Sequence, residues 1–266
     1  MKIIFIRHGD PDYVKDTLTE KGFREANLLA DRICRWNVKD FYCSPLGRAQ
    51  ATAQCTLKKL NRKATTFDWL REFYCPITDP VTGRHGVPWD FMPSHWTNEP
   101  LFYDKDHWQE AAIFQTNPDI KPAYDEVCAG IDSILSRYGY DRKGNYYRTP
   151  AAASTQDRGN AAKLPGTSSL DEGTALLQRP YCDDTIVLFC HLGVTMVMMS
   201  HLLGITPSLL WQNFFIAPSS VTILQSEERM PGEAYFRTQV MGDTTHLHDG
   251  NEPISQAGYF AEPFQL

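Results

Sequence analysis

The sequence predicts a fold of the α/β class, a three-layer α/β/α sandwich with a mainly parallel sheet and an inserted lid-like region. Two apolar runs, Lys2–Ile6 and Thr185–Cys190, are continuous rather than alternating, which is typical of strands buried on both faces. Segments with helical spacing alternate with such strands, as in a parallel sheet covered by helices. The chain has 266 residues, 42% hydrophobic and 22% charged, so it can bury a globular core without disulfides.

The elements of the first half follow from local signals. β-Branched and apolar residues at 2–6 predict a buried strand, and Thr19 can cap the helix that follows because its hydroxyl can accept from the first turn. Pro45 suits the first turn of a second helix. The predicted elements are, in order, a strand at 2–6, a helix from Thr19 to about Trp36, a strand at 38–43, a helix from Pro45 to about Leu60 and a strand at 65–69.

The second half contains the other strands of the sheet. An apolar strand at 185–190 leads into a helix at about 193–203, and further strands are expected at 221–225 and 235–241. We expect one domain, 1–266, with an insertion at about 76–183. Within the insertion, helices are plausible at about 105–115 and 123–138. The stretch 139–173 is rich in Gly, Pro, Ser, Thr, Ala and charge, which predicts a long loop.

Composition and charge exclude several functions. The net charge is −6, from 26 Lys and Arg against 32 Asp and Glu, which argues against nucleic-acid binding. A small anionic substrate stays possible, because a few arginines can make one pocket positive. The N-terminus lacks the features of a signal peptide, and no apolar run approaches a membrane span. We therefore expect a cytoplasmic protein that binds no membrane; its oligomeric state is left open.

Cysteine and histidine spacing predicts neither a disulfide framework nor a metal site. The seven cysteines are odd in number, widely spread and without a CxxC pair, so reduced and mostly buried thiols are expected. His246 and His248 have no third ligand at metal-binding spacing, which favours surface positions. No metal and no cofactor is predicted.

Charged side chains gather at the ends of four predicted strands. Arg7-His8-Gly9 follows the first strand, Arg48 begins the helix after the second, Glu72 follows the third, and His191 ends the strand at 185–190. The carboxyl ends of parallel strands line the crevice in which open α/β sheets bind ligands. Two histidines and two arginines there are suited to meet an anion.

The tripeptide Arg-His-Gly occurs twice, so it is weak evidence alone. The second copy, at 84–86, follows a turn-like segment rather than a strand. It is expected to be a coincidence or to contribute a lid residue.

The ordered set of motifs resembles the histidine phosphatase (phosphoglycerate mutase-like) superfamily. The motifs are RHG at 7–9, LTEKG at 18–22, SPLGRAQATA at 44–53, LRE at 70–72, the strand-borne His191 and GDTTHL at 242–247. They cover roughly residues 1–75 and 183–247, and the middle of the chain carries no family signature.

The resemblance implies a mechanism and a small phosphorylated substrate. His8 would attack phosphorus and carry the phosphoryl group as phosphohistidine. Arg7, Arg48 and His191 would bind the phosphate. Glu72 would protonate the leaving oxygen and later activate water. The three cationic groups would take the place of a metal ion.

This sequence departs from the family pattern at three places near the site. Leu192 stands where many relatives have glycine, Asp10 stands where glutamate is common, and the long mutase loop between RHG and the following helix is missing. Phosphate hydrolysis is therefore favoured over mutase activity. Asp10, Tyr13 and Leu192 are possible substrate contacts. The insertion is expected to act as a lid that contacts the rest of the substrate through its aromatic and histidine residues: Trp89, Phe91, His95, Trp96, Tyr103, His107 and Trp108.

Three alternatives stay open besides hydrolysis on His8. The first is phosphoryl transfer of the phosphoglycerate mutase type. The second is a Mg²⁺-dependent aspartyl phosphatase on Asp10, since residues 10–14 match DxDxV, although RHG separates Asp10 from the strand end and no GDxxxD follows. The third is a phospholigand-binding protein without turnover.

Overall fold

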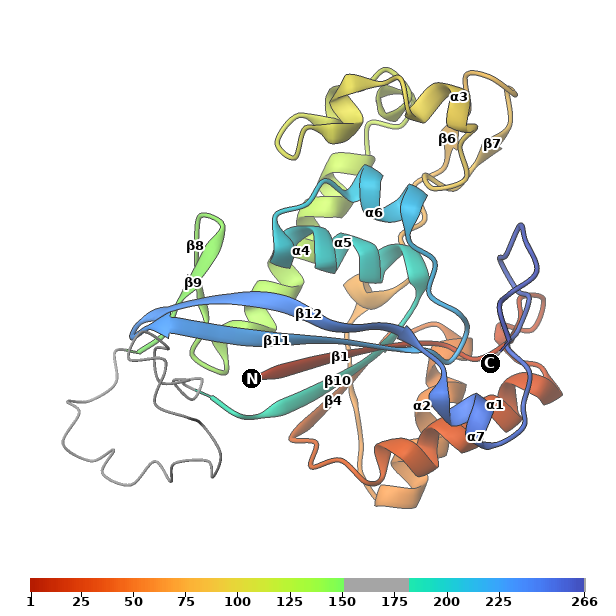
Figure 1. Ribbon diagram of the computed structural model, residues 1–266, viewed down its shortest axis with the longest axis vertical. Helices are drawn as coiled ribbons and strands as arrows, with labels where there is room; N and C mark the ends of the chain where they lie inside the picture. Colours follow the sequence, from red (N-terminus) through yellow and green to blue (C-terminus); the bar gives the residue numbers. More distant parts are fainter. Residues whose placement is uncertain (151–181, 266) are drawn as a thin grey trace, which may run out of the picture.

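The computed structural model describes residues 1–150 and 182–265 and confirms the predicted fold class (Figure 1). A central eight-stranded sheet has the order β5-β4-β10-β1-β11-β12-β9-β8. Its strands are β1 (Lys2–Arg7), β4 (Asp40–Cys43), β5 (Thr65–Thr66), β8 (Asp141–Lys143), β9 (Tyr146–Arg148), β10 (Thr185–Cys190), β11 (Val221–Met230) and β12 (Glu233–Asp243). The two-residue strands β2 (Pro11–Asp12) and β3 (Thr17–Leu18) pair separately.

The half of the sheet that carries the predicted site is parallel. β1 pairs with β10, β10 with β4 and β4 with β5, all in parallel, whereas β11 and β12 extend the sheet in antiparallel fashion. Arg7 is paired with Cys190, and Phe189 with Cys43. Three strands therefore end at the same edge, and the residues that follow them come together.

Helices cover both faces of the sheet. Figure 1 shows α1, α2 and α7 on one side and α4, α5 and α6 on the other. The helices are α1 (Glu20–Ile33), α2 (Gly47–Leu60), α4 (Ile120–Ser136), α5 (Leu192–Leu203), α6 (Pro207–Asn213) and α7 (Thr245–Asp249). Within β1, Ile4 and Ile6 pack against α1 and α2, whereas Ile3 and Phe5 belong to the core on the other face. This alternation follows from the two-residue period of a strand.

Element boundaries agree with the local signals in most places. Thr19 caps α1, accepting a hydrogen bond from the Gly22 amide at 3.0 Å. The second helix begins at Gly47 rather than at Pro45, because the Ser44 hydroxyl accepts from the Leu46 amide and holds a turn there. The strand expected at 65–69 ends at Thr66. The 3₁₀ helix η1 (Asp68–Leu70) follows it.

The first part of the insertion contains short elements rather than the predicted helix at 105–115. It includes the hairpin β6 (Ile77–Thr78) and β7 (His85–Gly86), helix α3 (Pro93–Trp96), and the 3₁₀ turns η2 (Pro100–Tyr103), η3 (Trp108–Glu110) and η4 (Phe114–Thr116). The helix prediction was wrong because Trp108 and Phe114 both pack against Trp211, with ring centroids 5.8 and 6.3 Å away. The helix predicted at 123–138 is confirmed as α4.

The beginning of the predicted loop at 139–173 is ordered sheet. Residues 141–148 form the β8–β9 hairpin, which joins the main sheet through β12. Tyr140, which precedes β8, and Tyr147, within β9, are buried and pack against Phe236. The prediction was wrong here because two buried tyrosines are too few to produce a visible strand pattern. The rest of the predicted loop, 151–173, lies outside the described residues.

The cysteines are all free thiols, and Cys43, Cys75, Cys128 and Cys190 are buried. His246 is also buried rather than on the surface, and burial beside Arg32 lowers its pKa to about 4. No helix within the two described segments has the length and apolar character that crossing a membrane requires. In the same segments, no group of three His, Cys, Asp or Glu side chains could hold a metal ion.

Candidate active site

The parallel strands bring His8 and His191 together. The His8 amide donates to the Cys190 carbonyl at 3.1 Å, and the two imidazole ring centroids lie 5.1 Å apart. Both side chains are buried, with His8 only 2% exposed. Two histidines that are 183 positions apart in the sequence therefore lie together, buried at the carboxyl edge of the sheet.

His8 is held as a neutral imidazole of defined tautomer. Its Nδ1 lies 2.8 Å from the Gly9 carbonyl oxygen. Because a carbonyl oxygen can only accept, Nδ1 carries the proton and the lone pair is on Nε2. Burial, and then the charges of Arg7 and Arg48, hold the pKa of His8 well below its usual range. Such a nitrogen is ready to act as a nucleophile at neutral pH.

His191 lies next to His8 but, unlike His8, does not line the cavity described below. Its Nε2 is 2.7 Å from the Ser44 hydroxyl, and its Nδ1 is buried with no hydrogen-bond partner among the residues described. Burial, followed by the influence of His8 and the two arginines, lowers its pKa well below the usual value. The expected contact of His191 with phosphate therefore stays a prediction.

Arg7 and Arg48 are each held by other residues. One Arg7 Nη donates to the Ile216 carbonyl at 2.6 Å, and the guanidinium lies over the ring of Phe215, 5.0 Å from its centroid. Arg48 Nη1 lies 2.8 Å from Asp16 Oδ1. These contacts fix the orientation of the two forked donors, which suits them to phosphate oxygens.

Glu72 has a carboxyl group poised to carry a proton. Its Oε1 accepts hydrogen bonds from its neighbour's amide, Phe73, at 2.8 Å and from the amide of Val194 in the first turn of α5 at 3.1 Å. Burial raises the pKa of Glu72 despite these bonds and despite Arg7. A raised pKa favours the protonated form that a general acid requires.

Gly193 allows this close packing. A Cβ at this position would clash with the indole of Trp89 and would come within 2.8 Å of Glu72 Oε1. Glycine at 193 therefore lets α5 begin directly against the catalytic candidate Glu72 and the insertion. The sequence alone did not indicate that Gly193 packs against Glu72 and Trp89.

One cavity of about 1340 Å³ joins these residues to the insertion and the C-terminal segment. Tyr13 and Leu192 line it, as do Trp89, Phe91 and Trp96 of the insertion. The walls consist of Arg7, His8, Tyr13, Leu46, Arg48, Arg71, Glu72, Tyr74, Arg84, Val87, Trp89, Asp90, Phe91, Met92, Pro93, Trp96, Leu192, Trp211, Gln212, Asn213, Phe214, Phe215, Gly258, Tyr259, Phe260 and Ala261. Most of the predicted site residues thus face a single space.

Other residues of the predicted lid lie away from the cavity. His107 is on the surface, with Nδ1 3.1 Å from the Asp104 carboxylate, and Trp108 is buried in the core. His95 and Tyr103 are not among the lining residues either. The second Arg-His-Gly lies at hairpin β6–β7, where Arg84 lines the cavity. His85 does not line it.

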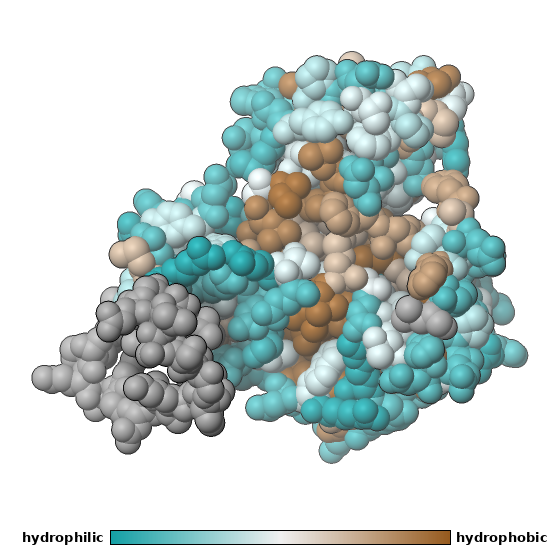
Figure 2. Space-filling model, in the orientation of Figure 1, coloured by the Kyte–Doolittle hydropathy of each residue, from teal (hydrophilic) through white to brown (hydrophobic). Residues whose placement is uncertain are grey.

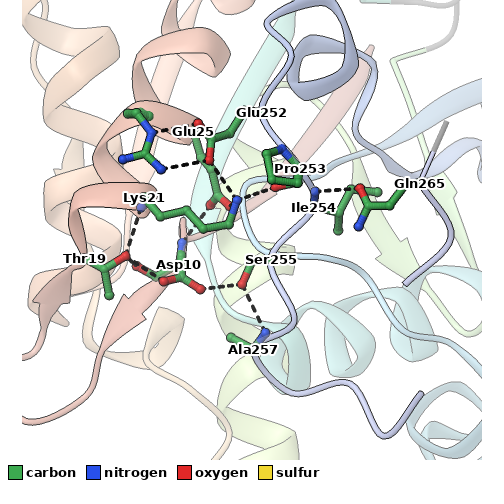
Figure 3. A network of polar contacts seen from close by, with 12 residues as sticks. Asp10, Thr19, Lys21, Glu25, Glu252, Pro253, Ile254, Ser255, Ala257 and Gln265 are labelled. Atoms are coloured by element: carbon green, nitrogen blue, oxygen red, sulfur yellow. Dashed lines mark hydrogen bonds and ion pairs between the residues drawn. The ribbon is translucent and has the colours of Figure 1, made fainter. Parts of the chain in front are cut away.

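Asp10 does not line the cavity, and its expected contact with substrate stays a prediction. Its Oδ2 accepts from the Thr19 hydroxyl at 2.6 Å, and its Oδ1 accepts from the Ser255 hydroxyl (Figure 3). The same network connects Lys21 of α1 to Glu252 at 2.9 Å. Asp10 therefore ties the C-terminal segment to the loop after β1.

Several lining residues were missed by the sequence analysis. Trp211, Phe214 and Phe215 follow α5, and Gly258–Ala261 lie near the C-terminus. The available signal was the cluster of aromatic residues at 214–215 and 259–260, which no predicted helix or strand would bury. Nothing in their spacing indicated which part of the fold they would contact.

The fold and this constellation define an α/β protein in which two histidines, two arginines and a glutamate gather at the carboxyl edge of the sheet. The predicted resemblance to the histidine phosphatases is confirmed for the N-terminal part of the chain: residues 3–80 match the family model of the histidine phosphatase superfamily (branch 1). The 2,3-bisphosphoglycerate-dependent phosphoglycerate mutase of Thermoplasma acidophilum is 40% identical over 77 residues. That match covers 25% of this chain and 38% of the mutase, well under half of the relative's length.

Solved structures share the fold at low sequence identity. A mutant phosphoserine phosphatase from Entamoeba histolytica, in complex with phosphoserine, has a TM-score of 0.54 at 16% identity, over 92% of this chain and 98% of that one. The α-ribazole phosphatase from Shigella flexneri has a TM-score of 0.52 at 16% identity, over 92% and 97%. A mycobacterial glucosyl-3-phosphoglycerate phosphatase has a TM-score of 0.53 at 15% identity, over 91% and 98%.

Proposed function

We propose that this protein is a metal-independent phosphomonoesterase that forms a phosphohistidine intermediate on His8. The observation that carries the proposal is the 2.8 Å contact between His8 Nδ1 and the Gly9 carbonyl oxygen. In this contact Nδ1 donates, which leaves the lone pair on Nε2, and the pKa of His8 lies well below the usual range. His8 lines the same cavity as Arg7, Arg48 and Glu72.

The reaction would proceed in two steps. Nε2 of His8 attacks phosphorus, the bond from phosphorus to the leaving oxygen breaks, and protonated Glu72 gives its proton to that oxygen. Water then attacks the phosphohistidine, Glu72 takes a proton from it, and inorganic phosphate leaves with His8 restored. The raised pKa of Glu72 supports both of its roles.

The cationic groups would stabilise the charge that develops on the transferring oxygens. Arg7 and Arg48 are fixed by their contacts with Ile216 and Asp16, so binding costs them little reorganisation. The lowered pKa of His191 favours its neutral form. A phosphate dianion beside it would favour the protonated form, and its buried Nδ1 is then available as a donor.

Hydrolysis is favoured over mutase activity, although a mutase is among the relatives. The mutase match covers only 25% of this chain, and the loop typical of mutases is missing after RHG. The neighbours named above are described as phosphatases. Release of inorganic phosphate, rather than its transfer between glycerate hydroxyls, is the expected outcome.

The aspartyl-phosphatase alternative has little support from the geometry. Both carboxylate oxygens of Asp10 accept hydrogen bonds from hydroxyl groups, and Asp10 does not line the cavity. A non-catalytic phospholigand protein would need no protonated carboxyl at the site, whereas burial favours the protonated form of Glu72.

The test is turnover of a panel of phosphorylated glycerates, sugars, nucleotides, amino acids and aryl alcohols, each with and without EDTA. We expect phosphate release that EDTA leaves unchanged. Strict dependence on Mg²⁺ would support the aspartyl alternative. Binding without turnover of any ester would support the phospholigand alternative.

A further inference from the structure

Many aromatic side chains line the cavity beyond Arg7, His8, Arg48 and Glu72. Ten of its lining residues are aromatic: Tyr13, Tyr74, Trp89, Phe91, Trp96, Trp211, Phe214, Phe215, Tyr259 and Phe260. They come from the loop after β1, from the segment that follows η1, from the insertion, from the segment that includes α6, and from the C-terminal segment. Five separate parts of the chain thus contribute the same kind of surface to one space.

Apolar exposure on the described surface is concentrated at this cavity. Of the twelve large hydrophobic side chains that the described residues leave exposed, five line it: Tyr13, Tyr74, Met92, Phe214 and Phe260. Figure 2 shows hydrophobic residues gathered across the middle of the molecule, at the level of α5 and α6. Clustered apolar exposure is unfavourable in water and marks a binding surface.

The aromatic wall is rigidly built. Trp211 packs against Phe73 and Trp89, with ring centroids 5.3 and 6.4 Å away, and Phe215 packs against Tyr259 at 3.9 Å. Phe215 also lies against the guanidinium of Arg7, so the wall is continuous with the phosphate-binding groups. An ester that places its phosphate near Arg7 therefore has these rings beside its leaving group.

The size of the space indicates a large leaving group. At about 1340 Å³ the cavity exceeds the roughly 300–1000 Å³ that is usual for a drug-sized ligand. An ester as small as a phosphoglycerate would leave most of the aromatic wall in contact with water.

We propose that the substrate is a small-molecule phosphomonoester with a bulky, apolar leaving group that packs against this wall. The proposal rests on the proposed function and narrows its substrate class. Burial of apolar area would contribute binding energy that a compact polar ester cannot supply.

The experiment compares esters that differ only in apolar area. Ethyl, butyl, hexyl and octyl phosphate share one type of leaving group, and phenyl and 2-naphthyl phosphate have leaving groups of similar acidity. We expect kcat/KM to rise about threefold per added methylene and about tenfold from phenyl to naphthyl. A flat series, or a preference for 3-phosphoglycerate over octyl phosphate, would overturn the proposal.

Variants locate the effect in the cavity. Trp96→Ala and Phe214→Ala should bring the octyl-to-ethyl ratio of kcat/KM toward one. The matched controls are Tyr103→Ala and Phe23→Ala, which remove exposed aromatic side chains that do not line the cavity. A ratio that falls equally in the controls, or stays unchanged in both cavity variants, would contradict the assignment.

Binding separates this proposal from the proposed function. Octyl phosphonate and methyl phosphonate cannot be hydrolysed, and Trp89, Trp96 and Trp211 report their binding by fluorescence. If no ester is turned over, the proposed function fails, yet tighter binding of octyl phosphonate would still support the aromatic subsite. Equal affinities would overturn it. A phosphopeptide hydrolysed faster than every alkyl and aryl ester would overturn it in favour of a protein substrate.

Discussion

The imidazole rings of His8 and His191 lie 5.1 Å apart, each one residue beyond the paired positions Arg7 and Cys190 of two adjacent parallel strands. The strand register brings the two residues side by side, and contacts with Gly9 and Ser44 orient their rings. Burial, together with nearby positive groups, lowers the pKa of both imidazoles and favours their neutral forms. A neutral His8 therefore lies near Arg7 and Arg48, whose guanidinium groups are held by Ile216 and Asp16.

Replacing Glu72 should affect substrates according to their leaving groups. Glu72→Gln removes the proton that the departing oxygen needs, so hydrolysis of alkyl phosphates should slow by about 10²–10⁴-fold. Aryl phosphates, whose leaving groups depart with little protonation, should lose less in the step that forms the phosphoenzyme. Steady-state and single-turnover rates of both classes check this. Equal losses would show that Glu72 is structural.

The pH profile should carry the signature of the same carboxyl. Since burial raises the pKa of Glu72, the group is protonated at low pH and loses its proton as pH rises through that pKa. For alkyl phosphates, kcat/KM should therefore fall on the alkaline side. That limb should be missing from the profile of Glu72→Gln. An identical alkaline limb in the variant would assign it to another group.

Gly193→Ala should impair the site specifically. Its Cβ would clash with Trp89 and press on Glu72, so we expect a loss of kcat that is larger for alkyl than for aryl phosphates. Gly130→Ala is the matched control, because a Cβ at Gly130 of α4 would clash with the indole of Trp69 instead. Both variants should lower the melting temperature. If both change the alkyl-to-aryl ratio equally, the effect comes from general destabilisation.

Glu25 should make stability depend on pH. This residue of α1 is buried, accepts from the Asp10 amide at 2.8 Å, and has a pKa raised to about 7, with burial as the main cause. The folded protein thus holds a proton that the unfolded chain releases near pH 4.5. The contribution of Glu25 to the free energy of unfolding is largest below pH 4.5. It falls by on the order of 3 kcal/mol as the pH rises to about 7.

Denaturant unfolding of wild type and Glu25→Gln between pH 4 and 8 measures this contribution. The difference in unfolding free energy between the two should change over the window from about 4.5 to 7. Glu20→Gln is the control, because Glu20 occupies the first turn of the same helix and is exposed. A pH-independent difference for Glu25→Gln would contradict the expectation.

Much of the fold could be predicted because the strands that build the parallel half are apolar throughout. Lys2–Ile6 and Thr185–Cys190 were evident for that reason, and Arg7, His8, Arg48 and Glu72 were placed by the strand ends that precede them. Thr19 was recognisable as a cap because capping needs only local contacts.

The rest depends on contacts that sequence spacing does not encode. Asp10 was predicted as a possible substrate contact. Its carboxylate accepts a hydrogen bond from Ser255, which lies 245 positions away in the sequence. Residues 141–148 form a β-hairpin that is held in the sheet by the antiparallel pairing of β9 with β12. Phe260 reaches the cavity through the tertiary path of the C-terminal segment, which local patterns do not reveal.

Trapping the phosphoenzyme is the most direct test of the mechanism on His8. The wild type is mixed briefly with ³²P-labelled substrate. One portion is denatured in alkali, which preserves phosphohistidine, and a second is denatured in acid, which preserves an aspartyl phosphate; both are digested for peptide mapping, and His8→Ala is treated in parallel. The account predicts label on the peptide that contains His8, stable in alkali and lost in acid, and neither label nor turnover in His8→Ala. Acid-stable label on Asp10, or undiminished turnover in His8→Ala, would contradict it.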